Sequence, residues 1–294
     1  MSLVVGKIEG NLLRFISDSK VTNSNLEKGS PLTGILKSII LTTKRCVSFA
    51  GNNYFAEILL DEFYSNKIKS DYTMLTRCLR LNIESNNETD FCVGMINNNM
   101  PQIIKISNGE ISSPLHDVWL GDKFAFNKYQ QAFLEEKNYN NIFAKMEKSF
   151  EQVISDDKIT SVGDFQFSIE TQMDQDNNLV FLYYPRFVVN IVEQELRPTQ
   201  QPQPILFGGA DKGGYAISYF RSNSYAKPAI AIHIAQGNLG LLFCPSIDHR
   251  KAIVFTNEFN GEEFAFRISK KYDMIFEGFV ENKGYAMKLI RTDK

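Results

Sequence analysis

The stretch that decides the fold is LVVGKIEGNLLRFISD, residues 3–18. Two apolar runs of similar length flank the turn Glu9-Gly10-Asn11, and this pattern indicates a β-hairpin and not a helix. Paired strands lie roughly 5 Å apart, so a hairpin of this size returns the chain to its start. We therefore expect the carboxylate of Asp18 to lie near Ser2.

The composition is that of an ordinary globular protein. Of 294 residues, 43% are hydrophobic and 22% are charged, which is enough to bury a sizeable core. Thirty-two basic residues face thirty-four acidic ones, and the formal net charge is -2. This balance offers no excess charge to hold a nucleic acid or an anionic membrane, so we expect neither as a partner.

The lack of leader-like and membrane-spanning segments and the use of cysteine predict the cellular compartment. No basic-then-apolar leader opens the chain, and no apolar run approaches the ~18 residues that span a bilayer. The four cysteines are far apart in mostly apolar segments, a pattern of reduced core thiols and not of a disulfide frame or a zinc site. We therefore expect a cytoplasmic protein without a cofactor or a bound metal.

Along the chain, runs of strands alternate with pairs of helices. After the hairpin, the apolar patterns predict strands at 35–41 and 46–50, helices at 53–64 and 71–83, and strands at 91–96, 102–106 and 118–122. Helical patterns then cover 124–134 and 142–153, and strands resume at 166–171 and 179–184. Beyond them we expect strands at 215–221, 229–235, 239–244 and 252–256, a helix at 262–275 and a strand near 278–289. Paired helices argue against a doubly wound parallel sheet and favour an α+β sandwich of mainly antiparallel sheets.

One segment is compositionally biased. Residues 197–204 are rich in proline and glutamine, which favours an extended surface loop without helix or sheet. We expect a single domain, 1–294, with a loop or insertion near 186–214.

Several of these motifs together resemble the opening of proteasome-type N-terminal nucleophile hydrolases. They are Val4-Val5-Gly6, the run from Phe15 to Val21, Lys37-Ser38-Ile39-Ile40, Ser48-Phe49-Ala50-Gly51 and the later Gly121-Asp122-Lys123-Phe124-Ala125. The resemblance covers roughly residues 1 to 185 in pattern and the first fifty in motif. It implies a four-layer αββα sandwich, a tendency to self-associate, and hydrolysis of an amide or peptide substrate.

The resemblance also implies roles for three residues. In that family an N-terminal threonine, serine or cysteine attacks an acyl carbon, and its own amine serves as the base, since an α-amine titrates at about 7.7 to 8.0. Ser2 falls on the nucleophile position once Met1 is removed, and Asp18 falls on the position of the orienting aspartate. Lys37 or Ser38 falls on the position of a lysine that stabilises negative charge.

The chain departs from the family pattern at these positions. No threonine stands at the start, and Ser38, not Lys37, directly precedes Ile39-Ile40. Strand alternation therefore predicts that Lys37 faces the opposite side unless the register slips by one residue.

Each candidate residue also has a structural interpretation. Ser2 also fits a loosely held terminal residue or a residue left by cloning, Asp18 fits a cap of the following turn, and Lys37 fits a solvated strand lysine. His233 in an apolar strand is typical of a hydrogen-bonded sheet histidine more than of a catalytic base. The glycine-rich residues 208–214 lack the ending of a phosphate-binding loop and favour a turn.

Two functions remain from the sequence. The first is an amide or peptide hydrolase that uses Ser2, with Asp18 and Lys37 in support. The second is a non-catalytic assembly subunit or binding module with the same architecture.

Overall fold

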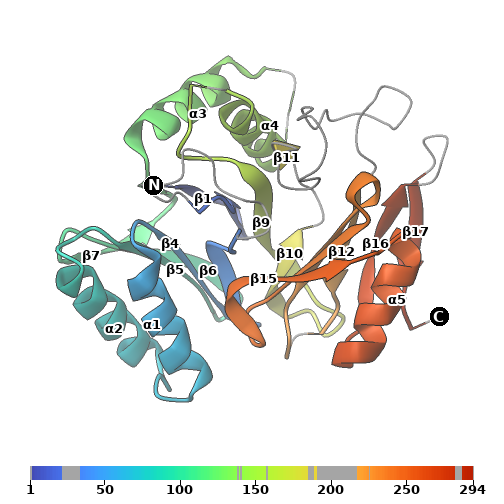
Figure 1. The fold of residues 1–294 in the computed structure, drawn as a ribbon. Helices are drawn as coiled ribbons and strands as arrows, with labels where there is room; N and C mark the ends of the chain where they lie inside the picture. Colours follow the sequence, from blue (N-terminus) through green and yellow to red (C-terminus); the bar gives the residue numbers. More distant parts are fainter. Residues whose placement is uncertain are drawn as a thin grey trace.

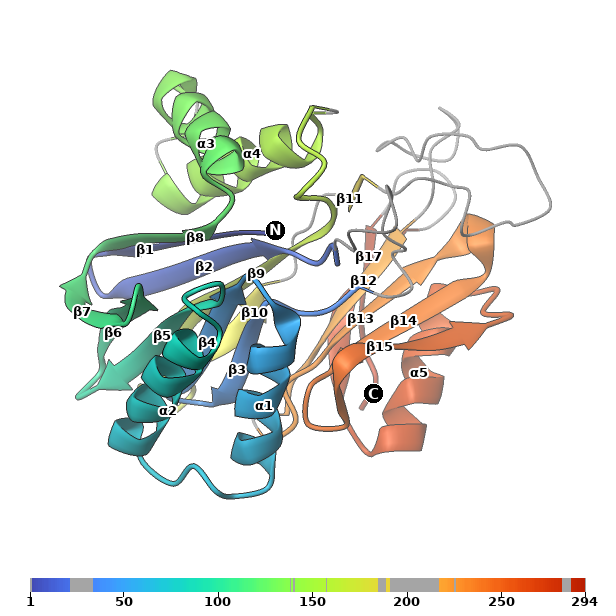
Figure 2. The same ribbon diagram turned by 60° about the vertical axis from the view of Figure 1, so that its left-hand side comes forward.

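The computed structural model describes residues 2–21, 34–137, 139, 141–156, 158–184, 189–190, 217–224, 226–281 and 287–293. The proline- and glutamine-rich segment 197–204 and the glycine-rich segment 208–214 lie outside these described residues. Within the described ranges the strands form three sheets, shown from two sides in Figures 1 and 2.

The first sheet is built on the hairpin that opens the chain. Strand β1 (Leu3–Glu9) pairs antiparallel with β2 (Leu12–Asp18), with Val4 opposite Ser17. The other strands of this sheet are β8 (Asp117–Gly121) beside β1, β9 (Asp164–Met173) beside β2, β10 (Leu179–Tyr184) beside β9, and the two-residue β11 (Val189–Asn190), which also pairs with β9. The hairpin thus lies in the middle of the sheet, in the order β10-β9-β2-β1-β8.

The second sheet is a meander whose strands pair in chain order. Its strands are β3 (Ser38–Thr42), β4 (Arg45–Ala50), β5 (Asp90–Asn97), β6 (Met100–Ser107) and β7 (Glu110–Leu115). The turn between β6 and β7 uses Asn108 and Gly109 with positive φ angles of 54° and 73°, as a two-residue hairpin turn requires. Local turn chemistry therefore sets the register of this hairpin.

The third sheet contains the strands that follow residue 217. They are β12 (Ile217–Ser222), β13 (Ile230–Ile234), β14 (Leu239–Cys244), β15 (Asp248–Thr256), β16 (Phe276–Glu281) and β17 (Met287–Arg291), and a single 3-10 turn, η4 (Ala235–Gly237), joins β13 to β14. The order is β15-β14-β13-β12-β16-β17, and all pairings are antiparallel.

The helices cover the outer faces of the sheets. As Figures 1 and 2 show, α3 (Lys123–Glu135) and α4 (Ile142–Ile154) lie over the first sheet, and α1 (Asn53–Tyr64) and α2 (Asp71–Glu84) lie over the second. Helix α5 (Gly261–Tyr272) covers the third sheet. Each helix begins after a polar N-cap that accepts backbone N–H groups of the first turn. Among the residues that the structure describes, no helix is both long and apolar enough to cross a bilayer.

The third sheet packs against the other two through a shared core. Phe243 of β14 contacts Phe165 and Phe167 of β9, with ring centroids 6.2 and 5.0 Å apart. On the opposite face of the third sheet, Phe220 and Leu242 belong to a separate cluster with Phe264 of α5. The third sheet is therefore buried on both faces.

The predicted four-layer αββα sandwich is wrong. The strands after residue 217 do not extend either of the first two sheets, because β12 pairs only with β13 and β16 among the described strands. They form a third sheet with its own helix, α5. Apolar strand patterns identify strands but not their partners, so the sequence did not reveal this additional sheet.

Candidate functional site

The opening hairpin brings the carboxylate of Asp18 next to the start of the chain, as the sequence predicts. The backbone N–H of Leu3, the residue after Ser2, donates a hydrogen bond to Oδ1 of Asp18 at 3.0 Å. Oδ2 accepts a second backbone N–H, from Lys20, at 3.1 Å. Asp18 thus caps the turn that follows β2, as its structural interpretation predicts, and its role in supporting catalysis stays a prediction.

Lys37 completes a buried ion pair with Asp18. Its Nζ donates to Oδ2 of Asp18 at 2.7 Å and also to the carbonyl oxygen of Lys20. The exposed fraction is 0% for Asp18 and 1% for Lys37. The interpretation of Lys37 as a solvated strand lysine is therefore wrong.

The expected orientation of Lys37 is also wrong. Strand β3 begins at Ser38, one residue after Lys37, so strand alternation does not fix the direction of the Lys37 side chain. The backbone at Lys37 is held by the N–H of Phe49, which donates to its carbonyl oxygen at 2.9 Å. Within the strand, the hydroxyl of Ser38 instead pairs with that of Ser48 at 2.8 Å. Lys37, not Ser38, is the residue that reaches Asp18.

Ser2 is held firmly by its backbone. Its carbonyl oxygen accepts the N–H of Asp122 at 2.8 Å, and the residue is only 4% exposed, so it is not loosely held. Gly121 has a φ of 100°, and a Cβ at this position would lie 1.9 Å from the Ser2 carbonyl oxygen and 3.2 Å from the Cβ of Ala50. A glycine is required here for β8 to approach Ser2 so closely. The motifs around Ala50 and Gly121 therefore meet near Ser2.

Sequence reasoning missed a second carboxylate with its partner beside Ser2. Asp122 caps α3 through Oδ1, which accepts the N–H groups of Phe124 and Ala125, while Oδ2 accepts the hydroxyl of Ser161 at 2.6 Å. Burial alone raises the pKa of Asp122, but these hydrogen bonds outweigh it and hold the pKa below its ordinary value. Asp122 appears in the sequence only as part of the motif 121–125, and no sequence signal marks Ser161, which lies in the loop after α4.

The arrangement combines a serine, a buried ammonium group and two carboxylates. Ser2 follows Met1 in the sequence, so its nitrogen is an amide here and becomes a base only when Ser2 is the first residue. A nearby ammonium group such as that of Lys37 favours negatively charged states of its neighbours. The printed contacts join Lys37 to Asp18 and Asp18 to the N–H of Leu3, beside Ser2.

The histidines do not join this site. His233 is buried in β13, where its Nε2 hydrogen-bonds the carbonyl oxygen of Glu258 at 2.6 Å, and burial lowers its pKa to about 4. His249 lies in β15, where Nε2 is 3.1 Å from a carboxylate oxygen of Asp61 and the ring stacks on Tyr64. The interpretation of His233 as a hydrogen-bonded sheet histidine fits these contacts.

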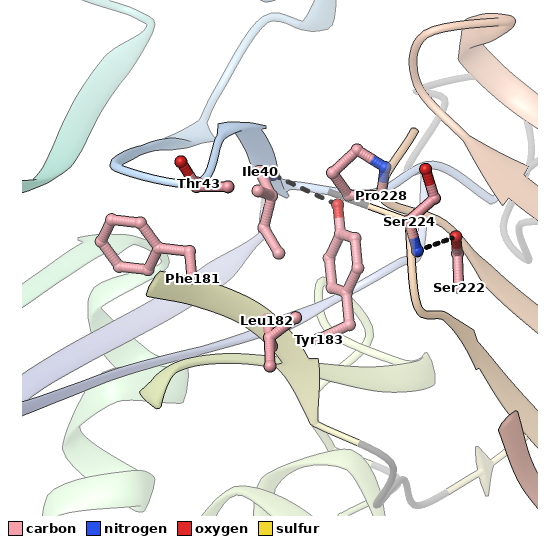
Figure 3. Close-up of a pocket in the computed structure, with 8 residues that line it drawn as sticks. All are labelled: Ile40, Thr43, Phe181, Leu182, Tyr183, Ser222, Ser224 and Pro228. Carbon is pink, nitrogen blue, oxygen red and sulfur yellow. Dashed lines mark hydrogen bonds between the residues drawn. The ribbon is translucent and has the colours of Figure 1, made fainter. Parts of the chain in front are cut away.

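A small cavity lies where the three sheets meet. Figure 3 shows the residues that line it, among them Tyr183, whose hydroxyl oxygen accepts the backbone N–H of Ile40 at 3.2 Å. Its volume is about 10 Å³, which is room for a single water at most. This junction is therefore a packing contact and not a ligand site.

The family models and the curated proteins do not identify a family for this chain. No protein-family model matches the sequence, and no curated protein matches it. The resemblance to proteasome-type hydrolases therefore stays a prediction drawn from the motifs.

Proposed function

We propose that the chain is an amide or peptide hydrolase in which Ser2, once it carries the free α-amine, is the nucleophile. The observation that carries this proposal is the buried Asp18–Lys37 pair, because Asp18 also binds the N–H of the residue next to Ser2. Hydrogen bonds thereby bring Asp18 and Lys37 to the start of the chain, next to Ser2.

In the proposed reaction, Oγ of Ser2 attacks the carbonyl carbon of an amide and passes its proton to its own α-amine. The C–N bond then breaks, and the leaving amine takes that proton, which leaves an ester on Ser2. Water hydrolyses the ester and restores the hydroxyl group. Lys37 stabilises the negative charge that develops on the substrate oxygen, and Asp18 holds Lys37 in position.

A non-catalytic assembly subunit or binding module is the second candidate. It is favoured by the low exposure of Ser2 and by the two oxygen partners that already bind the Lys37 ammonium group. In that case the buried ion pair fixes the hairpin against the second sheet, and self-association is the expected property to measure.

Labelling separates the two candidates. We expect a preparation that begins at Ser2 to release the fluorophore from a peptide amide and to be labelled at Ser2 by a serine-reactive peptide electrophile. The variant Ser2→Ala should lose both fluorophore release and labelling, because it lacks the nucleophilic hydroxyl group. Mass spectrometry of the intact protein verifies the first residue and locates the label.

Ser246→Ala is the matched control, since Ser246 is an exposed serine in the third sheet's β14–β15 turn and should not affect labelling. Unchanged labelling of Ser2→Ala would rule out Ser2 as the nucleophile. Retention of Met1 in the natively expressed chain would also contradict the mechanism, because the amine would then belong to another residue.

A further inference from the structure

A second cavity lies beside the opening hairpin, and neither Asp18 nor Lys37 lines it. It is enclosed by β1, β8 and α3, with Met146 of α4 behind it, and its volume is about 420 Å³. Figures 1 and 2 show α3 above the edge of the first sheet at this place. Small-molecule sites typically have volumes of about 300 to 1,000 Å³, so the cavity is large enough for a ligand.

A row of aromatic rings forms much of the wall. Trp119 of β8 stacks on Phe126 of α3, with centroids 4.4 Å apart and planes at 9°. Tyr129 and Phe133 continue the row along α3, at centroid distances of 6.3 and 5.9 Å between successive rings. These side chains present an apolar surface, so the body of a complementary ligand is apolar.

Positive charges flank the aromatic row at both ends. The Nζ of Lys105 lies 5.3 Å from the centroid of the Trp119 ring, and the Nζ of Lys145 lies 4.6 Å from that of Phe133. Aromatic faces attract such cations, although neither lysine lines the cavity itself.

The polar part of the wall is an ion pair whose two partners differ in exposure to solvent. Lys7 of β1 and Asp117 of β8 are cross-strand neighbours, and their side chains pair at 2.5 Å. The Lys7 side chain is 22% exposed, whereas that of Asp117 is 66% exposed. Both side chains line the cavity, and Lys7 is the more buried partner. Exposed ion pairs are weak, so a second carboxylate can compete with Asp117 for Lys7.

The remaining polar groups near this end can donate hydrogen bonds to an anion. Burial, and next the charge of Asp117, raise the pKa of Tyr129 well above its ordinary value, so its hydroxyl stays protonated. Gln130, at the next position of α3, adds an amide group, which can donate as well as accept.

We propose that this cavity binds a small carboxylic acid, with its apolar body against Trp119 and Phe126 and its carboxylate on Nζ of Lys7 in place of Asp117. The ammonium group of Lys7 offers a partner for the carboxylate, and the aromatic row offers a surface for the apolar body. The site is independent of the proposed reaction at Ser2.

Trp119 is the single tryptophan of the chain, so its fluorescence reports directly from this cavity. The full chain is titrated in 0.15 M salt with 4-phenylbutyrate, 4-phenylbutanol and 4-phenylbutylamine, which share one apolar body. We expect a saturable change with the carboxylate, at an affinity about tenfold higher than with the alcohol or the amine.

Two variants test the role of the ion pair. Lys7→Met keeps an apolar stem of similar length but removes the ammonium group, so the carboxylate should bind no better than the alcohol. Asp117→Asn removes the competing carboxylate and should strengthen binding of 4-phenylbutyrate. Lys128→Met is the matched control, because Lys128 lies on the same helix and pairs with Asp156 outside the cavity; it should leave the preference unchanged.

The proposal is overturned if none of the three probes gives a saturable change, or if the alcohol or the amine binds as tightly as the carboxylate. It is also overturned if Lys7→Met, shown to be folded by circular dichroism, keeps the preference for the carboxylate.

Discussion

Asp18 and Lys37 carry opposite charges in a part of the molecule that water does not reach. Burying two charges costs several kcal/mol per ion, and their attraction offsets this cost only when the geometry is good and other hydrogen bonds are made. Both conditions hold, since Asp18 accepts two backbone N–H groups and Lys37 donates to the carbonyl oxygen of Lys20. Each partner therefore depends on the other.

We expect Lys37→Met to lower the free energy of unfolding by about 3 to 5 kcal/mol, because it leaves the Asp18 carboxylate buried and unpaired. The double variant Lys37→Met/Asp18→Asn should be more stable than Lys37→Met alone, since no uncompensated charge remains. Urea unfolding at pH 7 measures both. Lys128→Met, which breaks an ion pair at the surface, serves as the control. If Lys37→Met and Lys128→Met lowered the free energy of unfolding equally, the buried pair would have no special role in stability.

At the scale of single residues, the sequence predicted which residues meet better than where their side chains point. The convergence of Asp18 on the start of the chain followed from hairpin geometry alone. The direction of Lys37 did not, because it depends on where β3 begins, and strand ends are the least certain part of any assignment. Ser161 could not be predicted, since its contact with Asp122 joins two loops that are 39 residues apart.

At the scale of elements, β13 in the third sheet carries a residue that links stability to pH. His233 is 2% exposed, and its Nε2 donates to the carbonyl oxygen of Glu258. Because a carbonyl oxygen only accepts, Nε2 carries the proton in the neutral ring. Burial disfavours the charged ring and lowers its pKa to about 4, from about 6.5 in an unfolded chain.

The sign of the pH effect follows from this lowered pKa. The unfolded chain binds the proton more readily, so the stabilising contribution of neutral His233 is present above about pH 6.5 and is lost as the pH falls toward 4. We expect the free energy of unfolding to fall by up to about 1.4 kcal/mol per pH unit within this window on account of this residue. Urea unfolding at pH 7, 6 and 5 measures the slope.

His233→Gln provides the comparison, because an amide group can donate to the same carbonyl oxygen but does not titrate in this range. The variant should have a shallower pH dependence between pH 6.5 and 4. Equal slopes for the two proteins would mean that His233 does not cause the effect.

Local sequence signals predicted the helices α1 and α2 well. The helix expected at 53–64 is α1 with its cap at Asn52, and the helix expected at 71–83 is α2 with a cap at Ser70. The single strand expected near 278–289 is wrong, since β16 and β17 are two strands of a hairpin in that region. Caps and turns are local and visible in the sequence, and the polar run Asn282-Lys283-Gly284 is a turn signal that the single-strand prediction did not use.

At the scale of the whole molecule, pairing between distant strands decides the architecture. Strand β9 pairs with β2 across about half the chain, and the third sheet packs on β9 through Phe243. Hydrophobic periodicity records that a strand is buried but not which strand it pairs with, so the three-sheet arrangement could not be read from the sequence. The single domain, the self-association and the cytoplasmic location stay predictions.

The two sites lie at different positions along the same opening hairpin. Ser2 and Asp18 lie at the end where β3 and β8 meet the start of the chain, and Lys7 lies toward the turn of the hairpin. A ligand in the α3 cavity would therefore contact β1, which begins at Leu3 directly after Ser2.

The most direct test of the proposed reaction compares two forms of the chain that both begin at Ser2, one with a free α-amine and one with that amine acetylated. Both are treated with the same serine-reactive peptide electrophile, and the label is located by peptide mapping. We predict labelling of Ser2 in the free-amine form and none in the acetylated form, because acetylation removes the base. Equal labelling of Ser2 in both forms, or no labelling in either, would contradict an N-terminal nucleophile.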